Sequence, residues 1–299
     1  MRRRFATLDV FTSRRFAGNP LAVVLEAQGL DTVAMQAIAR EFNHPETVFV
    51  LAAADPAHRA RLRIFTPAAE LPFAGHPTVG TAVLLGRLDG GAASRRITLE
   101  EGIGPVSCET APTDRDAGYA SFALPRLPVE AGAAPDAAAA AAALSLPRDD
   151  IGFDGFQPAR WSAGVALTFI PVRSLAAIGR ARPDPARFDA TFATDGRALV
   201  YLYCGEAAEA GHDFHARMFA PGMGIPEDPA TGAAAAAFAG LLAASGRYAD
   251  GRRSLRIEQG YEMGRPSLIE LTMEITGGRL AGASIGGDAV MVTDGVIEA

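Results

Sequence analysis

Three short motifs occur twice in this 299-residue chain, in the same order, and this internal repeat constrains the fold more than any other feature. The matching segments are 63–67 (RIFTP) with 217–221 (RMFAP), 76–80 (HPTVG) with 228–232 (DPATG), and 97–102 (ITLEEG) with 255–260 (LRIEQG). A run of small, uncharged residues follows each copy of the second motif. We interpret the chain as a duplicated unit, in which each copy has its own strands and its own buried helix.

Local patterns predict several elements and the boundary between the copies. Asp31 is a typical N-cap, and Asn43 ends the helical pattern that follows it. Asp136 predicts a short helix over the alanine run behind it. Proline, glycine and alanine accumulate over 125–135, where we place the boundary between the halves. Asp294-Gly295 has the composition of a hairpin turn.

The absence of lysine excludes whole classes of chemistry. All 28 basic residues are arginine, so neither a lysine Schiff base, as in pyridoxal phosphate enzymes, nor a Walker-type phosphate loop can form. The net charge of −6 gives no basic face for nucleic acid or anionic lipid. The longest uncharged apolar run, 232–246, is shorter than the ~20 residues of a membrane span. We therefore expect a cytoplasmic protein that binds neither nucleic acid nor membranes.

The second motif of each copy is the best candidate for a binding site. Proline favours the first turn of a helix and aspartate favours the N-cap, so His76-Pro77 and Asp228-Pro229 are each expected to open a helix. The first amides of a helix attract anions. If the two copies face each other, His76 and Asp228 meet in one cleft that fits a carboxylate. Alternatively, Asp228 is only a helix cap and His76 an ordinary loop residue.

Glu46 is the candidate for proton transfer, because it stands at the start of the apolar strand 48–51. A buried carboxylate is costly and tends to have a raised pKa, which suits acid–base chemistry near neutral pH. An exposed glutamate at a strand edge is the alternative. His212 and His215 have no cysteine nearby, so we expect turn and strand roles for them and no metal site.

These motifs resemble the PhzF-like family of phenazine biosynthesis, whose fold is shared with diaminopimelate epimerase and proline racemase. The matching stretches span most of the chain and are 9–12 (DVFT), 18–24 (GNPLAVV), 46–50 (ETVFV), 63–67, 70–77 (ELPFAGHP), 228–232 and 257–266 (IEQGYEMGRP). The resemblance implies an α+β fold of two similar, pseudo-symmetric domains, each a curved, mostly antiparallel sheet wrapped around a central helix. We expect residues 1–126 with 288–299 to form the N-terminal repeat domain and 127–287 the C-terminal one.

The resemblance also implies an isomerase that needs no cofactor and moves a proton on a small carboxylate bound between the domains. Motif matching makes Glu46, His76 and Asp228 the catalytic residues, and Gly75, Gly232 and Ala233 the residues that bind substrate. A homodimer is expected on the same ground. The family commonly has serine where this chain has Ala233, which makes the phenazine precursor an uncertain substrate.

Two other functions stay open at this stage. One is a non-catalytic protein that binds a small carboxylate in the same cleft. The other is an amino-acid epimerase of the same fold, but those enzymes use two cysteines where His76 and Asp228 stand here. Cys108 and Cys204 lie outside those motifs and far apart, which indicates reduced structural thiols.

Overall fold

Residues 1–90 and 93–299 are described by the structure, a computed structural model, and they divide into two units. Unit 1 comprises Met1–Ala123 and Gly286–Ala299, and unit 2 comprises Leu124–Ile285. The long strand β17 (Arg279–Glu298) begins in unit 2 and ends in unit 1.

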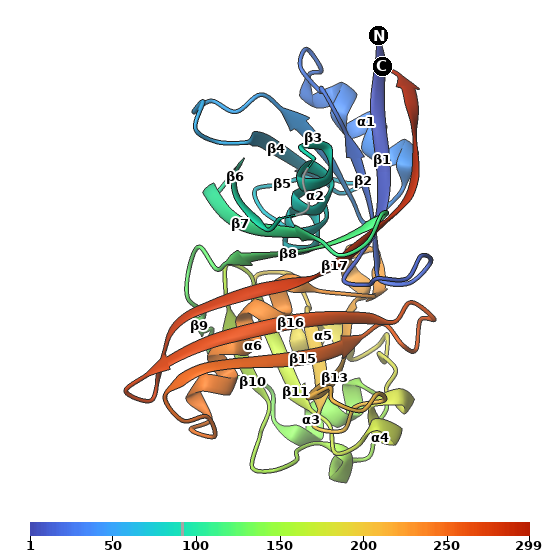
Figure 1. The fold of residues 1–299 in the computed structure, drawn as a ribbon. Coiled ribbons are helices and arrows are strands. Elements are labelled where there is room, and N and C mark those ends of the chain that lie inside the picture. Colours follow the sequence, from blue (N-terminus) through green and yellow to red (C-terminus); the bar gives the residue numbers. More distant parts are fainter. Residues whose placement is uncertain (91–92) are drawn as a thin grey trace. The chain divides into compact units, whose positions relative to one another are not determined.

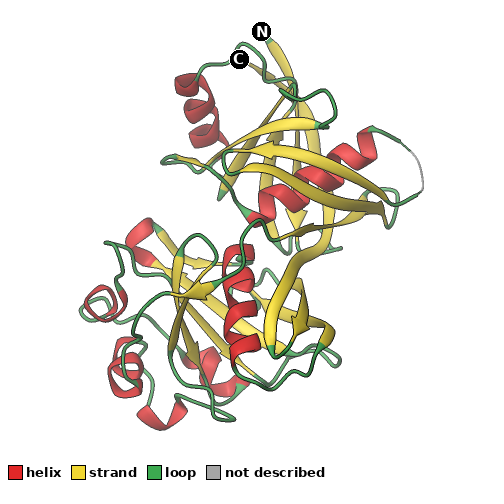
Figure 2. Ribbon diagram, turned by 90° about the vertical axis from the view of Figure 1, so that its left-hand side faces the viewer, coloured by secondary structure: helices red, strands yellow, loops and turns green. Residues whose placement is uncertain are grey.

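The described part of unit 1 contains eight further strands and two helices. They are β1 (Arg2–Val10), β2 (Asn19–Val24), α1 (Thr32–Phe42), β3 (Glu46–Leu51), β4 (Ala60–Phe65), β5 (Glu70–Leu71), α2 (Gly75–Leu88), β6 (Arg95–Glu101), β7 (Gly104–Pro112) and β8 (Ala117–Ala123). Strand pairing runs β1–β2–β3–β4–β6–β7–β8–β17 and returns from β17 to β1, so the sheet closes into a ring. The chain ends lie side by side because Arg2 pairs with Glu298 (Figures 1 and 2).

Helix α2 fills the inside of this ring (Figure 1). It contacts β1, β2, β3, β6, β7 and β8, and every residue from Gly75 to Leu85 is buried. A helix that is buried all round needs no polar face, which explains its run of small and apolar residues. Helix α1 is different: Asp31 caps its first turn and Asn43 ends it in the left-handed conformation, as the sequence predicts.

Unit 2 is built from strands, short helices and one long helix. Its elements are β9 (Val129–Glu130), α3 (Ala137–Ala143), η1 (Arg148–Asp150), β10 (Ala159–Ser162), β11 (Ala166–Pro171), α4 (Leu175–Arg180), α5 (Phe188–Phe192), β12 (Val200–Cys204), β13 (Phe214–Ala220), η2 (Pro221–Met223), β14 (Ile225–Asp228), α6 (Gly232–Ala244), β15 (Gly251–Gln259) and β16 (Ser267–Thr276). Helix α6 is buried from Ala234 to Ala243 and contacts β9, β10, β11 and β16. The predicted helix over the alanine run is confirmed as α3, with Asp136 accepting from the amides of Ala138 and Ala139.

Strand pairing follows the same sequence of directions in both units. In unit 1, β1–β2 is antiparallel, β2–β3 parallel, β3–β4 antiparallel, β4–β6 parallel and β6–β7 antiparallel. In unit 2, the series β10–β11, β11–β12, β12–β13, β13–β15 and β15–β16 has the same directions in the same order. Both units therefore combine a mostly antiparallel sheet with one long buried helix.

The hairpin predicted at Asp294-Gly295 is wrong. Both residues continue β17, where Gly295 pairs with Phe5 and Asp294 with Ala6 of β1. A Cβ atom on Gly295 would lie 2.8 Å from the Phe5 ring, so glycine here admits a close aromatic neighbour and makes no turn.

Candidate active site

Glu46 and His76 meet inside unit 1. Glu46 is the first residue of β3 and His76 is the second residue of α2. The Nε2 atom of His76 lies 3.3 Å from Oε2 of Glu46, and the two side chains expose only 6% and 15% of their surface. The expectation of an exposed, strand-edge glutamate is therefore wrong for this residue.

The His76 ring is neutral and its orientation is fixed. Burial lowers its pKa to about 3, and a hydrogen bond to the backbone carbonyl of Pro20 opposes this shift only in part. A carbonyl can only accept, so the ring nitrogen facing Pro20 carries the proton. Among residues 1–90 and 93–299, Nε2 has no hydrogen-bond partner, so it is the other nitrogen, Nδ1, that donates to Pro20. Nε2 therefore presents a lone pair towards Glu46.

The segment before Pro20 is held in place by hydrogen bonds within unit 1. The amide of Thr12 donates to the carbonyl of Asp288 at 3.1 Å, and the amide of Phe16 donates to Oδ2 of Asp9 at 2.6 Å. Asp9 and Pro20 are also register partners in the β1–β2 pair. These contacts fix the carbonyl that orients His76.

Helix α2 starts without a side-chain cap. Its N-cap is Ala74, which makes no side-chain hydrogen bond, and the buried Gly75 follows as its first residue. The amides of the first turn are thus left without a capping side chain beside His76. His76-Pro77 does lie in the first turn of a helix, as predicted.

Asp228 is placed differently from the prediction. It is the last residue of β14, and α6 begins only at Gly232, so Asp228 does not cap that helix. The N-cap is Thr231, whose hydroxyl donates to Oδ2 of Asp228 and accepts from none of the helix amides. Gly232 is buried and Ala233 is half-buried in the first turn of α6. This helix also starts without a side-chain cap.

Gln259 orients the Asp228 segment, and the sequence analysis did not single it out. Its Nε2 donates to the carbonyl of Asp228 at 2.7 Å and to the hydroxyl of Thr231 at 2.9 Å, and its Oε1 accepts from the Thr231 amide at 3.2 Å. The feature of the sequence that could have identified Gln259 is its position in the third repeated motif, directly before Gly260.

His212 and His215 form a separate network in unit 2. Their Nδ1 atoms lie 2.7 Å and 2.8 Å from the carboxylate of the buried Glu258, and Nε2 of His215 lies 3.0 Å from Oε1 of Glu262. Burial lowers the pKa of His215, but the two carboxylates outweigh it and raise the pKa overall. No group of three or more metal-ligating side chains occurs among residues 1–90 and 93–299. Within the same residues, no helix has the length and apolar character to cross a bilayer.

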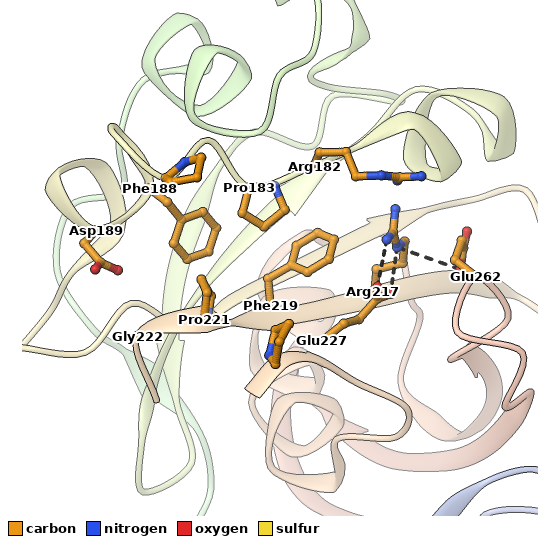
Figure 3. Close-up of a pocket in the computed structure, with 12 residues that line it drawn as sticks. Arg182, Pro183, Phe188, Asp189, Arg217, Phe219, Pro221, Gly222, Glu227 and Glu262 are labelled. Carbon is orange, nitrogen blue, oxygen red and sulfur yellow. Dashed lines mark hydrogen bonds and ion pairs between the residues drawn. The ribbon is translucent and has the colours of Figure 1, made fainter. Parts of the chain in front are cut away.

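A pocket of about 630 Å³ lies beside this network, and prolines and phenylalanines form half of its wall (Figure 3). Arg217, Glu227 and Glu262 lie at one end, and Asp189 lies at the other. Arg217 is fully engaged, because it pairs with Glu227 at 2.8 Å through two nitrogens and donates to two backbone carbonyls. The wall contains none of the six residues predicted from the sequence for catalysis or substrate binding, so we do not place the reaction there.

Comparison with known proteins decides the family. The model of the phenazine biosynthesis-like proteins, PhzC-PhzF, matches residues 8–295. The chain belongs to this family. It is 50% identical over 301 residues to an uncharacterized isomerase of Mesorhizobium japonicum, with 98% of each chain covered. It is 33% identical over 295 residues, again with 98% coverage of each, to the trans-2,3-dihydro-3-hydroxyanthranilate isomerase of Pseudomonas aeruginosa.

Solved structures of the PhzF family agree with this assignment. A phenazine biosynthesis protein of the PhzF family from Bacillus anthracis superposes with a TM-score of 0.89 and 25% identity, covering all of both chains. A hydroxyproline epimerase from Agrobacterium vitis shares the fold, with a TM-score of 0.58, 12% identity and coverage of 99% and 92%. Family membership together with the named relatives identifies this PhzF-family chain as an isomerase.

Proposed function

We propose that this protein moves a proton between carbon atoms of a small carboxylate substrate without a cofactor, with Glu46 as acid and base. The observation that carries the proposal is the pair formed by Glu46 and the neutral His76, whose Nε2 lone pair faces the Glu46 carboxyl at 3.3 Å. Two lone pairs at this distance repel unless a proton lies between them. Once Glu46 has taken a proton from a substrate, it can therefore donate a hydrogen bond to Nε2.

In the proposed cycle, ionised Glu46 takes a proton from a substrate carbon and returns a proton to a different carbon. His76 stays neutral and accepts a hydrogen bond from Glu46 whenever Glu46 is protonated. Its fixed ring keeps that acceptor in one position, since Pro20 holds the opposite nitrogen. The absence of lysine supports a mechanism without a Schiff base. General acid–base catalysis of this kind is worth ~10²–10⁴-fold in rate.

We assign the substrate carboxylate to amides at the start of α2, beside His76, and infer the same preference for anions at the start of α6. Both α2 and α6 begin without a side-chain cap, and both begin with a buried glycine, Gly75 or Gly232. Free amides at a helix N-terminus favour anions. Asp228 accepts from Thr231, and we propose that its carboxylate binds a substrate amine or hydroxyl group beside Ala233. We further propose that the two units are copies of one pseudo-symmetric motif, which the matching series of strand directions supports.

The epimerase alternative has less support. It requires two thiols, and His76 and Asp228 occupy the positions where such epimerases have cysteines. Cys108 and Cys204 are both buried, and burial raises the pKa of each thiol well above its ordinary value. Neither thiol is therefore suited to proton abstraction near neutral pH.

The test is proton exchange with solvent after exhaustive treatment with a chelator. The protein is incubated in deuterated water with trans-2,3-dihydro-3-hydroxyanthranilate and with a panel of cyclic and amino carboxylates. We expect deuterium at carbon in at least one compound, with full activity after chelation. Binding without any exchange would favour the non-catalytic alternative, and activity that returns only with added metal would contradict cofactor independence.

A further inference from the structure

Glu101 of unit 1 and Gln259 of unit 2 occupy the same place in the two copies of the fold. Each is the last residue of its strand, β6 or β15, and each is followed by a glycine. β6 pairs in parallel with β4, and β15 pairs in parallel with β13.

The residues next to them confirm this equivalence through their contacts. Glu100 and Glu258 each accept two backbone amides and one histidine Nδ1 from a single preceding loop. The donors are Ala54, Asp55 and His58 for Glu100, and Ala208, Glu209 and His212 for Glu258, at 2.7–2.9 Å. The contacts of Gln259 in unit 2 can therefore be compared directly with those of Glu101 in unit 1.

In unit 2 this position supplies a hydrogen-bond donor. The Gln259 amide donates to the hydroxyl of Thr231, and that hydroxyl in turn donates a hydrogen bond to Asp228. The chain of donors therefore runs from Gln259 through a threonine to the segment directly before α6.

In unit 1 a threonine also links the position to the start of a long helix. The Oγ1 atom of Thr78 lies 2.7 Å from the carbonyl oxygen of Ala74 and 2.8 Å from Oε1 of Glu101. A hydroxyl has one proton, and a carbonyl can only accept. If Thr78 donates to Ala74, the contact with Glu101 is a hydrogen bond only when Glu101 carries a proton and donates it.

The surroundings of Glu101 favour that neutral form. The residue is 7% exposed, and its Oε2 has no hydrogen-bond partner. The buried thiol of Cys108 on β7 interacts with it electrostatically. Glu101 lines a pocket on unit 1. The other charged side chains in the wall of this pocket are Arg61 and Arg63 of β4, Glu70 of β5 and Glu100 of β6.

None of these arginines neutralises Glu101. Arg63 is engaged by Glu70 at 2.6–2.7 Å, and within residues 1–90 and 93–299 no ion pair joins Glu101 to Arg61 or Arg63. Burial accordingly raises the pKa of Glu101 to about 8, against the smaller opposing effect of Thr78.

We propose that Glu101 is a protonated, hydrogen-bond-donating carboxylic acid at neutral pH and a positioning residue for the first turn of α2. Its chain of donors ends on Ala74, the residue directly before Gly75 and His76. The positioning role rests on the proposed function of His76. The protonation state does not, because it concerns the folded protein alone.

The experiment compares thermal unfolding of wild type, Glu101→Gln and Glu100→Gln between pH 5 and pH 9. Folding holds a proton on Glu101 that the unfolded chain releases above pH ~4.5. Wild-type stability therefore falls as pH rises from about 4.5 to about 8 and is level above that. Glutamine mimics the neutral donor, so Glu101→Gln should match wild type near pH 5 and unfold several degrees higher at pH 9.

Glu100→Gln is the matched control and should behave in the opposite way. The amides of Ala54 and Asp55, followed by His58, hold the pKa of Glu100 at about 2, so its charge stabilises the fold at neutral pH. That variant should unfold below wild type from pH 5 upwards. If Glu101→Gln also unfolds below wild type at pH 7–9, Glu101 is an ionised acceptor and the proposal is overturned.

Two further measurements separate this proposal from the proposed function. The infrared carbonyl band of a protonated carboxyl should be stronger at pH 7 in wild type than in Glu101→Gln, and this difference should disappear as pH rises above about 8. Equal bands at pH 7 would overturn the proposal. In the isomerase assay, wild-type kcat/KM should fall above pH 8, while Glu101→Gln keeps its rate. Equal pH profiles would overturn the positioning role. If no exchange activity is found at all, the proposed function fails while the infrared and unfolding results still decide the state of Glu101.

Discussion

The Nε2 atom of His76 faces Oε2 of Glu46 at 3.3 Å, with the Nδ1 side of the ring turned to the carbonyl of Pro20. This arrangement gives Glu46 a neutral hydrogen-bond acceptor and keeps the positive charge of an ionised histidine out of the site. An ionised histidine there would hold Glu46 as a tight ion pair and reduce its basicity. The low pKa of His76 is therefore a condition of the proposed chemistry.

The protonation state of His76 can be measured directly. Because burial lowers its pKa to about 3, the ring should stay neutral from pH 8 down to pH 4, with the proton on Nδ1 throughout. Nitrogen-15 NMR of labelled histidine distinguishes the two ring nitrogens. His58 is a suitable comparison, since 23% of its side chain is exposed. A His76 signal that titrates between pH 6 and pH 7 would contradict the arrangement.

The hydroxyl of Thr231 should control the affinity of the Asp228 segment for substrate. Thr231→Val keeps the shape but removes the donor to Asp228 and the acceptor for Gln259. Each of these two hydrogen bonds is worth ~0.5–1.5 kcal/mol, so kcat/KM should fall by roughly tenfold to a hundredfold. Thr231→Ser keeps the hydroxyl and should retain most activity. Equal losses in the two variants would assign the effect to packing.

Gly260 should tolerate no side chain, because it lies against the residue next to Asp228. Its φ is +79°, and a Cβ atom would lie 2.5 Å from the carbonyl oxygen of Arg265 and 2.7 Å from that of Pro229. Gly264 has a similar φ of +71° but nothing within 4 Å, so it serves as the control. Gly264→Ala should cost about 1–2 kcal/mol of strain, and Gly260→Ala clearly more, by chemical denaturation. Equal costs would show that the contacts at Gly260 are relieved by small shifts.

Ala233 should tune the choice of substrate without determining whether the site works. It is half-buried in the first turn of α6, at a position where the family resemblance implies serine. Ala233→Ser adds one donor, so affinity for trans-2,3-dihydro-3-hydroxyanthranilate should rise by up to roughly tenfold. Calorimetric titration of both proteins measures the change. Tight wild-type binding that serine leaves unchanged would show that this position does not recognise the substrate.

The sequence predicted best those features that depend on neighbouring residues. Asp31 and Asn43 mark the ends of α1, and Asp136 caps α3, because a cap acts on amides within three residues. The same local reasoning fails for Asp294-Gly295. This pair has the composition of a turn, but Gly295 lies in a strand, where its lack of a side chain makes room for the Phe5 ring. It also fails for Asp228, where Thr231 takes the cap position.

The hydrogen-bond partners of the candidate site residues lie far from them in the sequence and are brought together by the fold. Pro20 reaches His76 because β2 packs against α2, and Gln259 reaches Thr231 from 28 residues away. Neither contact leaves a periodic or spacing signal. The repeat was the exception: once Glu101 and Gln259 are aligned, each copy indicates what the other should do.

The most direct test of the account is deuterium incorporation by Glu46→Gln. Glutamine keeps the size of the side chain but cannot take a proton, so turnover and exchange at carbon should fall by ~10²–10⁴-fold. Substrate affinity should stay within about tenfold of wild type, and the exposed Glu41→Gln control should be unaffected. Exchange by Glu46→Gln at the wild-type rate would show that Glu46 carries no proton in the reaction, and the central claim would be wrong.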